Sequence, residues 1–173
     1  MATLMSDSKK FEHIRHKPPA ELTTKRPLII ALSPLRTHAN LSTIVRTAGC
    51  LGITEVIATG NAKIKPKIAR DGADNVNLTL RRSLTPTLKN LKADGYLLVG
   101  LEQTTNSVPL SEFEFPHKTV LVIGSEREGL KQDTLDLLDH VVEISVWGLP
   151  YSYNVATATS ICLHTYCTQF PKG

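Results

Sequence analysis

The stretch TVLVIGSEREGL, residues 119–130, decides the fold class of this 173-residue chain. Residues 120–123 are a continuous apolar run rather than an alternation of apolar and polar residues, which is typical of a strand buried on both faces of a sheet. Gly124 and Gly129 then permit a tight loop that lets backbone approach a ligand closely, and this loop carries the carboxylates Glu126 and Glu128. A buried strand that ends in a loop with polar side chains indicates an α/β protein whose functional groups follow its strands.

Short apolar runs of the same kind alternate with helix-like segments on both sides of this stretch. The predicted strands are Leu28–Leu32, Glu55–Ala58, Val76–Leu80, Tyr96–Leu101, Thr119–Ile123 and Val141–Ile144, and the predicted helices are Leu41–Leu51, Leu84–Ala93, Lys131–Leu138 and Val155–Thr168. This alternation favours one α/β domain at residues 27–173, with a doubly wound, mainly parallel sheet. Residues 1–26 are polar and basic, and we expect a flexible N-terminal arm there, with a short helix around Phe11–Arg15.

The charge of the chain is distributed unevenly. Residues 1–92 contain 16 lysines and arginines against 6 acidic residues, whereas residues 93–173 contain 4 against 10. The basic clusters are Lys9–Lys10, Arg15–Lys17, Lys25–Arg26, Lys63–Lys67 with Arg70, and Arg81–Arg82. Such a one-sided field suits a polyanion such as RNA, although charge alone slightly favours an ordinary solvated surface.

Several classes of protein are disfavoured by what the sequence lacks. It has no run of about 18 apolar residues, so we expect no membrane span, and its polar start is unlike a secretory signal. The three cysteines have no zinc-like spacing and the six histidines are scattered, which favours reduced thiols in a cytoplasmic protein without a metal. Neither GxGxxG nor a P-loop is present.

Two further loops carry unusual chemistry. SPLRTHAN, residues 33–40, follows the first strand; Asn40 is a candidate helix cap, and Arg46 lies one to two turns on among apolar neighbours. ISVWGLPYSYNVATA, residues 144–158, follows the last strand and delivers Ser152 and Asn154 to the start of a helix rich in small residues. Taken singly, each of these residues is compatible with capping or with a surface role.

Together the three loops resemble the signature motifs of the SpoU/TrmH group of SPOUT methyltransferases. The resemblance covers roughly residues 28–166, and the motifs match in order and spacing. It implies a deep C-terminal trefoil knot that holds S-adenosylmethionine and a homodimer with composite active sites. The implied reaction is methylation of a ribose 2′-hydroxyl in tRNA or rRNA, and the sequence leaves the choice between the two RNAs open.

The resemblance also assigns site residues. The implied catalytic residues are Arg46, Asn40, Glu126, Ser152 and Asn154, and the implied cofactor-binding residues are Leu101, Gly124, Ile144, Ser152 and Tyr153. Ser42, Trp147 and Ala156 depart from the residues usual in these motifs. Two alternatives stay open: a catalytically inactive knotted RNA-binding protein, and a flavodoxin-like or nucleotide-dependent enzyme acting on a small molecule.

Overall fold

A parallel sheet of seven strands forms the centre of the computed structural model, which describes residues 11–173. The strands are β1 (Leu28–Leu32), β2 (Glu55–Thr59), β3 (Asn77–Arg81), β4 (Leu97–Leu101), β5 (Val108–Pro109), β6 (Thr119–Ile123) and β7 (His140–Glu143), in the spatial order β3-β2-β1-β6-β4-β7-β5. The helices are α1 (His38–Cys50), α2 (Pro66–Ala69), α3 (Thr85–Ala93), α4 (Gln132–Leu135) and α5 (Val155–Gln169), with short 3-10 turns at Arg70–Ala73 and Leu110–Glu112.

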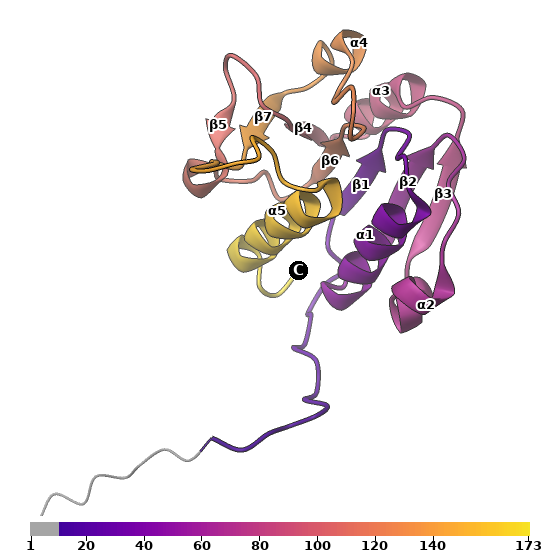
Figure 1. Cartoon of the computed structure of the whole chain (residues 1–173), viewed down its shortest axis with the longest axis vertical. Coiled ribbons are helices and arrows are strands. Elements are labelled where there is room, and N and C mark those ends of the chain that lie inside the picture. The colour runs from indigo at the N-terminus through magenta and orange to yellow at the C-terminus, as the bar shows by residue number, and fades with distance from the viewer. Residues whose placement is uncertain (1–10) are drawn as a thin grey trace, which may run out of the picture.

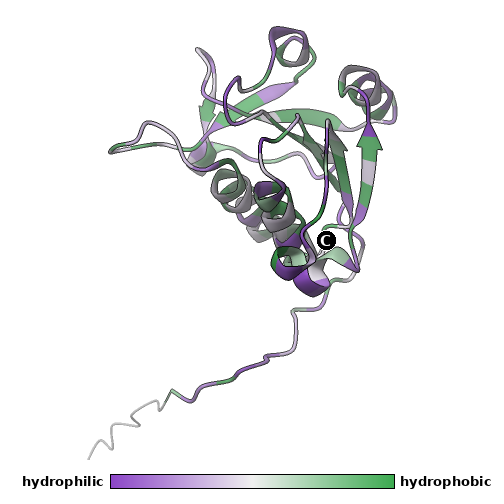
Figure 2. Ribbon diagram, turned by 45° about the vertical axis from the view of Figure 1, so that its right-hand side comes forward, coloured by the Kyte–Doolittle hydropathy of each residue, from purple (hydrophilic) through white to green (hydrophobic). Residues whose placement is uncertain are grey.

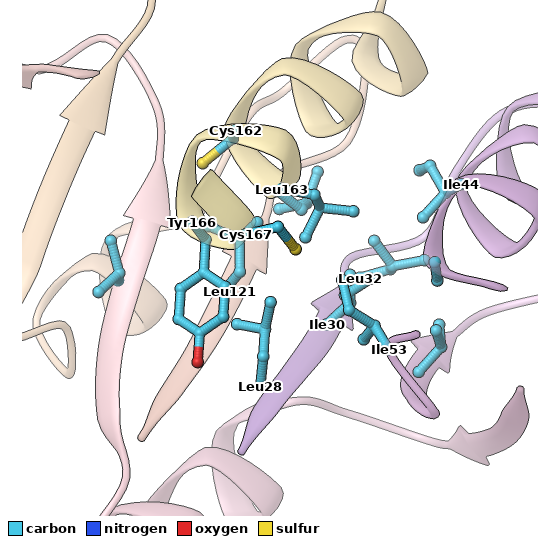
Figure 3. Packing of buried hydrophobic residues seen from close by; sticks show 14 of the residues in the cluster. Leu28, Ile30, Leu32, Ile44, Ile53, Leu121, Cys162, Leu163, Tyr166 and Cys167 are labelled. Carbon is cyan, nitrogen blue, oxygen red and sulfur yellow. The ribbon is translucent and has the colours of Figure 1, made fainter. Parts of the chain in front are cut away.

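The helices cover both faces of this sheet (Figure 1). Helices α1 and α5 lie side by side on one face, where Leu163 and Tyr166 of α5 share a buried cluster with Leu28, Ile30 and Leu32 of β1 (Figure 3). The opposite face of the same strands packs against Leu88 of α3 and the residues around α4. In Figure 2 the strands are mainly green, in agreement with their burial between two helical layers. The predicted doubly wound α/β architecture is confirmed.

Some predicted elements differ from those observed. Every predicted strand is present, with bounds that shift by one residue at one or both ends in four of the six. The helix predicted at Lys131–Leu138 is only the single turn α4, because the chain then bends to place Asp139, whose carboxylate accepts a hydrogen bond from the Leu98 backbone N–H at 2.8 Å. Strand β5 was not predicted, since two residues that end in proline carry no strand signal.

The N-terminal segment has two parts. Residues 11–20 are exposed and extend away from the domain, and the helix expected at Phe11–Arg15 is absent from this described segment (Figure 1). Closer to β1, the Thr23 backbone N–H donates to the Lys172 carbonyl at 2.9 Å, and the buried Arg26 donates to the carbonyls of Leu51 and Phe170. The basic pair Lys9–Lys10 lies outside the described residues. No helix within residues 11–173 has both the length and the apolar character that a membrane crossing needs.

Candidate active site

A cavity of about 580 Å³ opens at the carboxyl ends of β4, β6 and β7. In a parallel sheet this edge collects the loops that follow the strands, so residues far apart in sequence meet there. The five residues predicted to bind a cofactor all line this cavity: Leu101, Gly124, Ile144, Ser152 and Tyr153. We refer to it below as the cofactor cavity.

The loop after β6 folds tightly onto itself. The Ser125 N–H donates to the Gly129 carbonyl at 3.1 Å, and the Gly129 N–H donates back to the Ser125 carbonyl at 3.0 Å. A Cβ added at Gly124 would stand 2.6 Å from the Leu130 backbone nitrogen, a distance that forces the backbone apart. Gly124 is therefore required by the fold of its own loop, whereas the sequence had been interpreted as requiring it for close approach of a ligand.

Glu102 is a site residue that the sequence analysis missed. Its carboxylate accepts a hydrogen bond from the Leu130 N–H at 2.9 Å and fills the space that a Cβ on Gly129 would need. Glu102 therefore packs against the loop after β6 and stabilises it. It also lines the cofactor cavity. The available signal was its position directly after β4, at the same sheet edge as the other loops.

Three predicted catalytic residues form one hydrogen-bonded chain across the sheet edge. The Asn40 side-chain amide donates to Glu126 Oε1 at 2.8 Å, and the Asn154 amide donates to Asn40 Oδ1 at 3.2 Å. Asn154 also caps α5, because its Oδ1 accepts from the N–H groups of Ala156 at 2.9 Å and Thr157 at 3.3 Å. The structure thus brings together residues from all three sequence motifs.

The expectation that Asn40 caps α1 is wrong. Thr37 is the cap, and its hydroxyl accepts from the Asn40 N–H at 3.2 Å, so Asn40 lies inside the first turn. The apolar pattern that located this helix begins only at Leu41, because the first turn faces the site rather than the core. The amide of Asn40 is consequently free to reach Glu126.

The carboxylate of Glu126 is stabilised in its charged form. Partial burial alone would raise the pKa of this group, but hydrogen bonds from the Arg36 backbone N–H at 2.8 Å and from Asn40 outweigh that effect and lower the pKa. Glu126 is therefore an ionised acceptor at neutral pH. It fixes the Asn40 amide with its oxygen turned toward Asn154.

The other two predicted catalytic residues stand apart from this chain of hydrogen bonds. Ser152 lines the cofactor cavity in an exposed loop. Arg46 is exposed, and its guanidinium forms no ion pair among the described residues 11–173. Six residues along a helix correspond to a rise of about 9 Å and a rotation of about 240° from Asn40. Arg46 therefore faces a different direction from Asn40 in the single chain.

The charge of the cofactor cavity is predominantly negative. Four carboxylates line it against the single cationic side chain of Arg127: Glu102, Glu126, Glu128 and Glu143. Apolar side chains from the ends of the strands complete its walls, among them Leu101, Ile123 and Ile144. Among residues 11–173 we find no group of three or more His, Cys, Asp or Glu that could hold a metal ion. The cavity suits a ligand that carries positive charge together with an apolar portion.

Comparison with known proteins gives the family. The SpoU rRNA Methylase family model matches residues 27–164, which include all three loops described above. The chain belongs to the SpoU rRNA methylase family. This SpoU chain is 32% identical over 162 residues to a tRNA (guanosine(18)-2′-O)-methyltransferase of Saccharomyces cerevisiae, a match that covers 86% of the chain and 11% of the yeast protein.

Two further relatives are similar over most of the SpoU chain. A 23S rRNA (guanosine-2′-O-)-methyltransferase RlmB of Acinetobacter baylyi is 30% identical over 148 residues, which cover 82% of the chain and 60% of RlmB. The crystal structure of the A. aeolicus TrmH/SpoU tRNA modifying enzyme superposes with a TM-score of 0.81 at 26% identity, covering 88% of the chain and 79% of the enzyme. The SpoU chain thus spans only part of the length of these relatives.

Proposed function

We propose that this protein is an S-adenosylmethionine-dependent methyltransferase that acts on a ribose 2′-hydroxyl of tRNA or rRNA. The observation that carries the proposal is the hydrogen-bonded chain Asn154–Asn40–Glu126 at the rim of the cofactor cavity. The Saccharomyces cerevisiae and Acinetobacter baylyi relatives are named as guanosine 2′-O-methyltransferases of tRNA and of 23S rRNA, and these names support the same reaction class.

The cofactor cavity fits S-adenosylmethionine in charge and polarity. The bound cofactor supplies an electrophilic methyl group on a positively charged sulfur. Glu102, Glu126 and Glu143 surround the cavity with negative charge, and burial against Leu101 and Ile144 suits an adenine ring. The tight loop 124–129 offers backbone groups at fixed positions. We also propose the trefoil knot that the resemblance implies. The cavity lies between the loop after β6 and the segment 143–158, which the knot would bring together.

The residues of this chain contribute orientation and charge. Asn40 and Asn154 hold their amides fixed, so the acceptor ribose meets preorganised hydrogen-bonding groups rather than mobile ones. Ser152 lines the cofactor cavity on the loop after β7, which supports its assignment to the same site. The ribose hydroxyl would lose its proton to water or to a neighbouring phosphate as its oxygen bonds the methyl carbon, while the carbon–sulfur bond of the cofactor would break and leave a neutral thioether. A guanidinium remains protonated and stabilises the developing negative charge on oxygen.

Arg46 is the residue proposed to supply that guanidinium, from the second subunit of a homodimer. It lies on an exposed surface of α1 and faces away from the direction of Asn40 in its own chain. Part of the small-residue face of α5 is used within the chain, since Ser160 contacts Thr47 of α1 at 3.1 Å between their hydroxyl oxygens. The exposed remainder of both helices, including Arg46 and Ile161, is the proposed interface.

The N-terminal arm and the basic segment 63–70 are proposed to hold RNA phosphates. Residues 11–20 are exposed, and the segment 63–70 packs beside α1. A Cβ on Gly72 would lie 2.9 Å from the Cα of Arg46, so the chain that follows this basic segment touches α1 at the proposed catalytic arginine. This arrangement supports a continuous basic surface that leads toward Arg46.

The cytoplasm is the proposed compartment. All three cysteines are free, and burial raises the pKa of the Cys162 thiol, which keeps that thiol protonated and unreactive. Free cysteines persist where the environment is reducing.

Calorimetry with S-adenosylmethionine, followed by transfer of a labelled methyl group to bulk RNA, tests the proposal. We expect binding without RNA and label in the RNA fraction, with the Arg46→Ala variant retaining cofactor binding but losing transfer. Cofactor binding without any transfer, across tRNA and rRNA, would instead support the inactive RNA-binding protein. Transfer to a small molecule in place of RNA would favour the enzyme that acts on a small molecule.

A further inference from the structure

A second hollow, of about 480 Å³, opens beside the cofactor cavity over the carboxyl ends of β1, β2 and β3. Ser33, Thr59 and Arg82 line it, each at or directly after the end of one of these strands. The loop 125–129 separates the two spaces, and residues of this loop line both. We call this space the basic hollow, because of the cationic side chains around it: Arg36, Arg82, Arg127 and Lys131.

These cationic side chains are exposed, and none of them forms an ion pair within the described residues. Among the described residues 11–173, the ion pairs are Lys25–Glu55 and Lys92–Asp139, so none involves the basic hollow. Two carboxylates, Glu128 and Asp133, also line it, and Asp133 is engaged by the Thr85 hydroxyl at 3.3 Å. Cations therefore outnumber carboxylates by four to two here, the reverse of the charge in the cofactor cavity.

The amino-terminal end of α3 adds positive potential to the same hollow. Leu84 and Thr85, where this helix of nine residues begins, line the space, and no side chain caps the helix. Pro86 in this first turn has no backbone N–H, so Thr85 and Thr87 supply the N–H groups that can bind an anion, and the helix dipole favours negative charge there. Guanidinium, ammonium, hydroxyl and backbone N–H donors thus converge on one solvent-open space, a donor set suited to a phosphate group.

We propose that the basic hollow binds a phosphodiester group of the RNA strand that carries the methylated nucleotide. This inference rests on the proposed function and assigns the RNA strand a location. Only the loop 125–129 separates the hollow from the cofactor cavity, so a phosphate held there fixes the strand next to the reacting ribose. The same loop carries Glu126, whose carboxylate accepts a hydrogen bond from the Arg36 N–H. This hydrogen bond connects a residue that lines the cofactor cavity to one that lines the basic hollow.

Neighbouring residues provide matched controls for a test. Arg82 lines the basic hollow, whereas the adjacent Arg81 does not and its guanidinium donates to the Leu80 carbonyl instead. Lys131 lines the hollow, whereas Lys89, on the exposed surface of α3, does not. All four side chains are exposed, so their replacement by alanine leaves the core intact.

The measurement is equilibrium binding of RNA across a range of salt concentrations, in the presence of S-adenosylmethionine. We expect the Arg82→Ala, Lys131→Ala double variant to bind RNA about 10-fold more weakly and to lower the slope of log K against log salt by about 1. The affinity for S-adenosylmethionine should stay within about twofold of wild type in this double variant and in the control double variant. The Arg81→Ala, Lys89→Ala double variant should keep the wild-type affinity and slope. Equal behaviour of the two double variants overturns the inference.

Two further measurements are needed. Binding of inorganic phosphate distinguishes a free anion from RNA as the ligand of the basic hollow, and methyl-transfer kinetics distinguish this inference from the proposed function. If inorganic phosphate binds the wild-type protein through Arg82 while RNA affinity is unaffected by Arg82→Ala, the hollow serves a free anion and the RNA assignment is wrong. RNA binding through Arg82 without any methyl transfer contradicts the proposed function but keeps the basic hollow as a site for an RNA phosphate. Methyl transfer with a KM for RNA that Arg82→Ala does not change overturns this inference alone.

Discussion

Gly124 and Gly148 lie in two loops of the same site, but only Gly124 is crowded by neighbouring backbone. A Cβ on Gly124 meets the backbone of Gly129 and Leu130, whereas a Cβ on Gly148 has nothing within 4 Å. We expect Gly124→Ala to weaken S-adenosylmethionine binding at least about 10-fold by opening the loop 124–129, an effect of about 1.4 kcal/mol. Gly148→Ala should leave the affinity unchanged. Calorimetry on both variants measures the affinities. Equal affinities would mean that the closed geometry of the loop 124–129 does not contribute to cofactor binding.

Glu126 gives the site a defined dependence on pH. Its pKa is lowered in the folded protein, so its contribution to stability is fully present above the unfolded value, about 4.3, and is lost as pH falls through the lower folded pKa. Glu126→Gln turns one acceptor into a donor that faces the Arg36 N–H or the Asn40 amide. We expect a loss of about 1–3 kcal/mol at pH 7.

Urea unfolding at several pH values measures this difference. The gap between wild type and Glu126→Gln should begin to shrink as pH falls below the unfolded value of about 4.3, and should close once the pH is below the lowered folded pKa, where both side chains are neutral. Glu128→Gln serves as the control, because the Glu128 carboxylate is exposed and accepts no hydrogen bond among the described residues. A gap that does not vary with pH would mean that the Glu126 charge is irrelevant to the folded state.

Ser42 illustrates a departure from the family pattern with a structural explanation. Its hydroxyl is fully buried, donates to the His38 carbonyl at 2.6 Å and accepts from the Lys65 N–H at 2.7 Å. Ser42→Ala removes the acceptor of a backbone N–H, and we expect a loss of about 1–2 kcal/mol. Thr43→Ala, at a half-buried neighbour on α1, should change stability by less than about 0.5 kcal/mol. Similar losses in both would show that the tether to Lys65 adds no stability.

At the scale of elements, Asn154 has two roles that different substitutions can separate. Its oxygen caps α5 and its amide donates to Asn40. Asn154→Ala removes both and should cost about 1 kcal/mol through the lost cap. Asn154→Asp keeps the capping oxygen, so stability should be largely retained while methyl transfer is lost with the amide donor. An Asn154→Asp variant with wild-type activity would contradict the role of that amide.

The sequence predicted elements well where the core decided them and poorly where the site did. The predicted bounds of strands β1 and β6 agree with the observed ones, because both faces of each strand are buried and their residues are mainly apolar. Helix α1 starts three residues before its apolar pattern, since its first turn is polar and holds Asn40 at the site. Glu102 was missed because a single carboxylate after a strand has no distinctive spacing, and its partner, the Leu130 N–H, is 28 residues away.

At the scale of the whole molecule, the separation of Arg46 from the other site residues predicts a composite dimer. A mixed dimer of Arg46→Ala and Asn154→Ala subunits contains one site with both residues intact. We expect each variant alone to be inactive and the co-refolded mixture to regain activity at that one site. Light scattering establishes the dimer. Inactive mixed dimers would mean that each subunit uses its own Arg46, and an active monomer would rule the arrangement out.

The division of charge between the two halves of the chain has a spatial counterpart. The acidic cofactor cavity lies over the strands β4, β6 and β7, and the basic hollow lies over β1, β2 and β3. The charge count of the sequence predicted this arrangement only in part, because Arg127 and Lys131 of the basic hollow come from the acidic half of the chain. The boundary between the two spaces is the loop 125–129. That boundary is where a methyl donor and an RNA strand would meet.

The position of the transferred methyl group tests the central claim most directly. Purified protein is incubated with tRNA or rRNA and S-adenosylmethionine that carries an isotopically labelled methyl group, and the RNA is digested to nucleosides for mass spectrometry. Fragmentation separates the base from the ribose. We expect the label to remain with the ribose, as a 2′-O-methyl nucleoside, and Arg46→Ala to abolish the labelling. Label on the base, or none on any RNA despite bound cofactor, would contradict this claim.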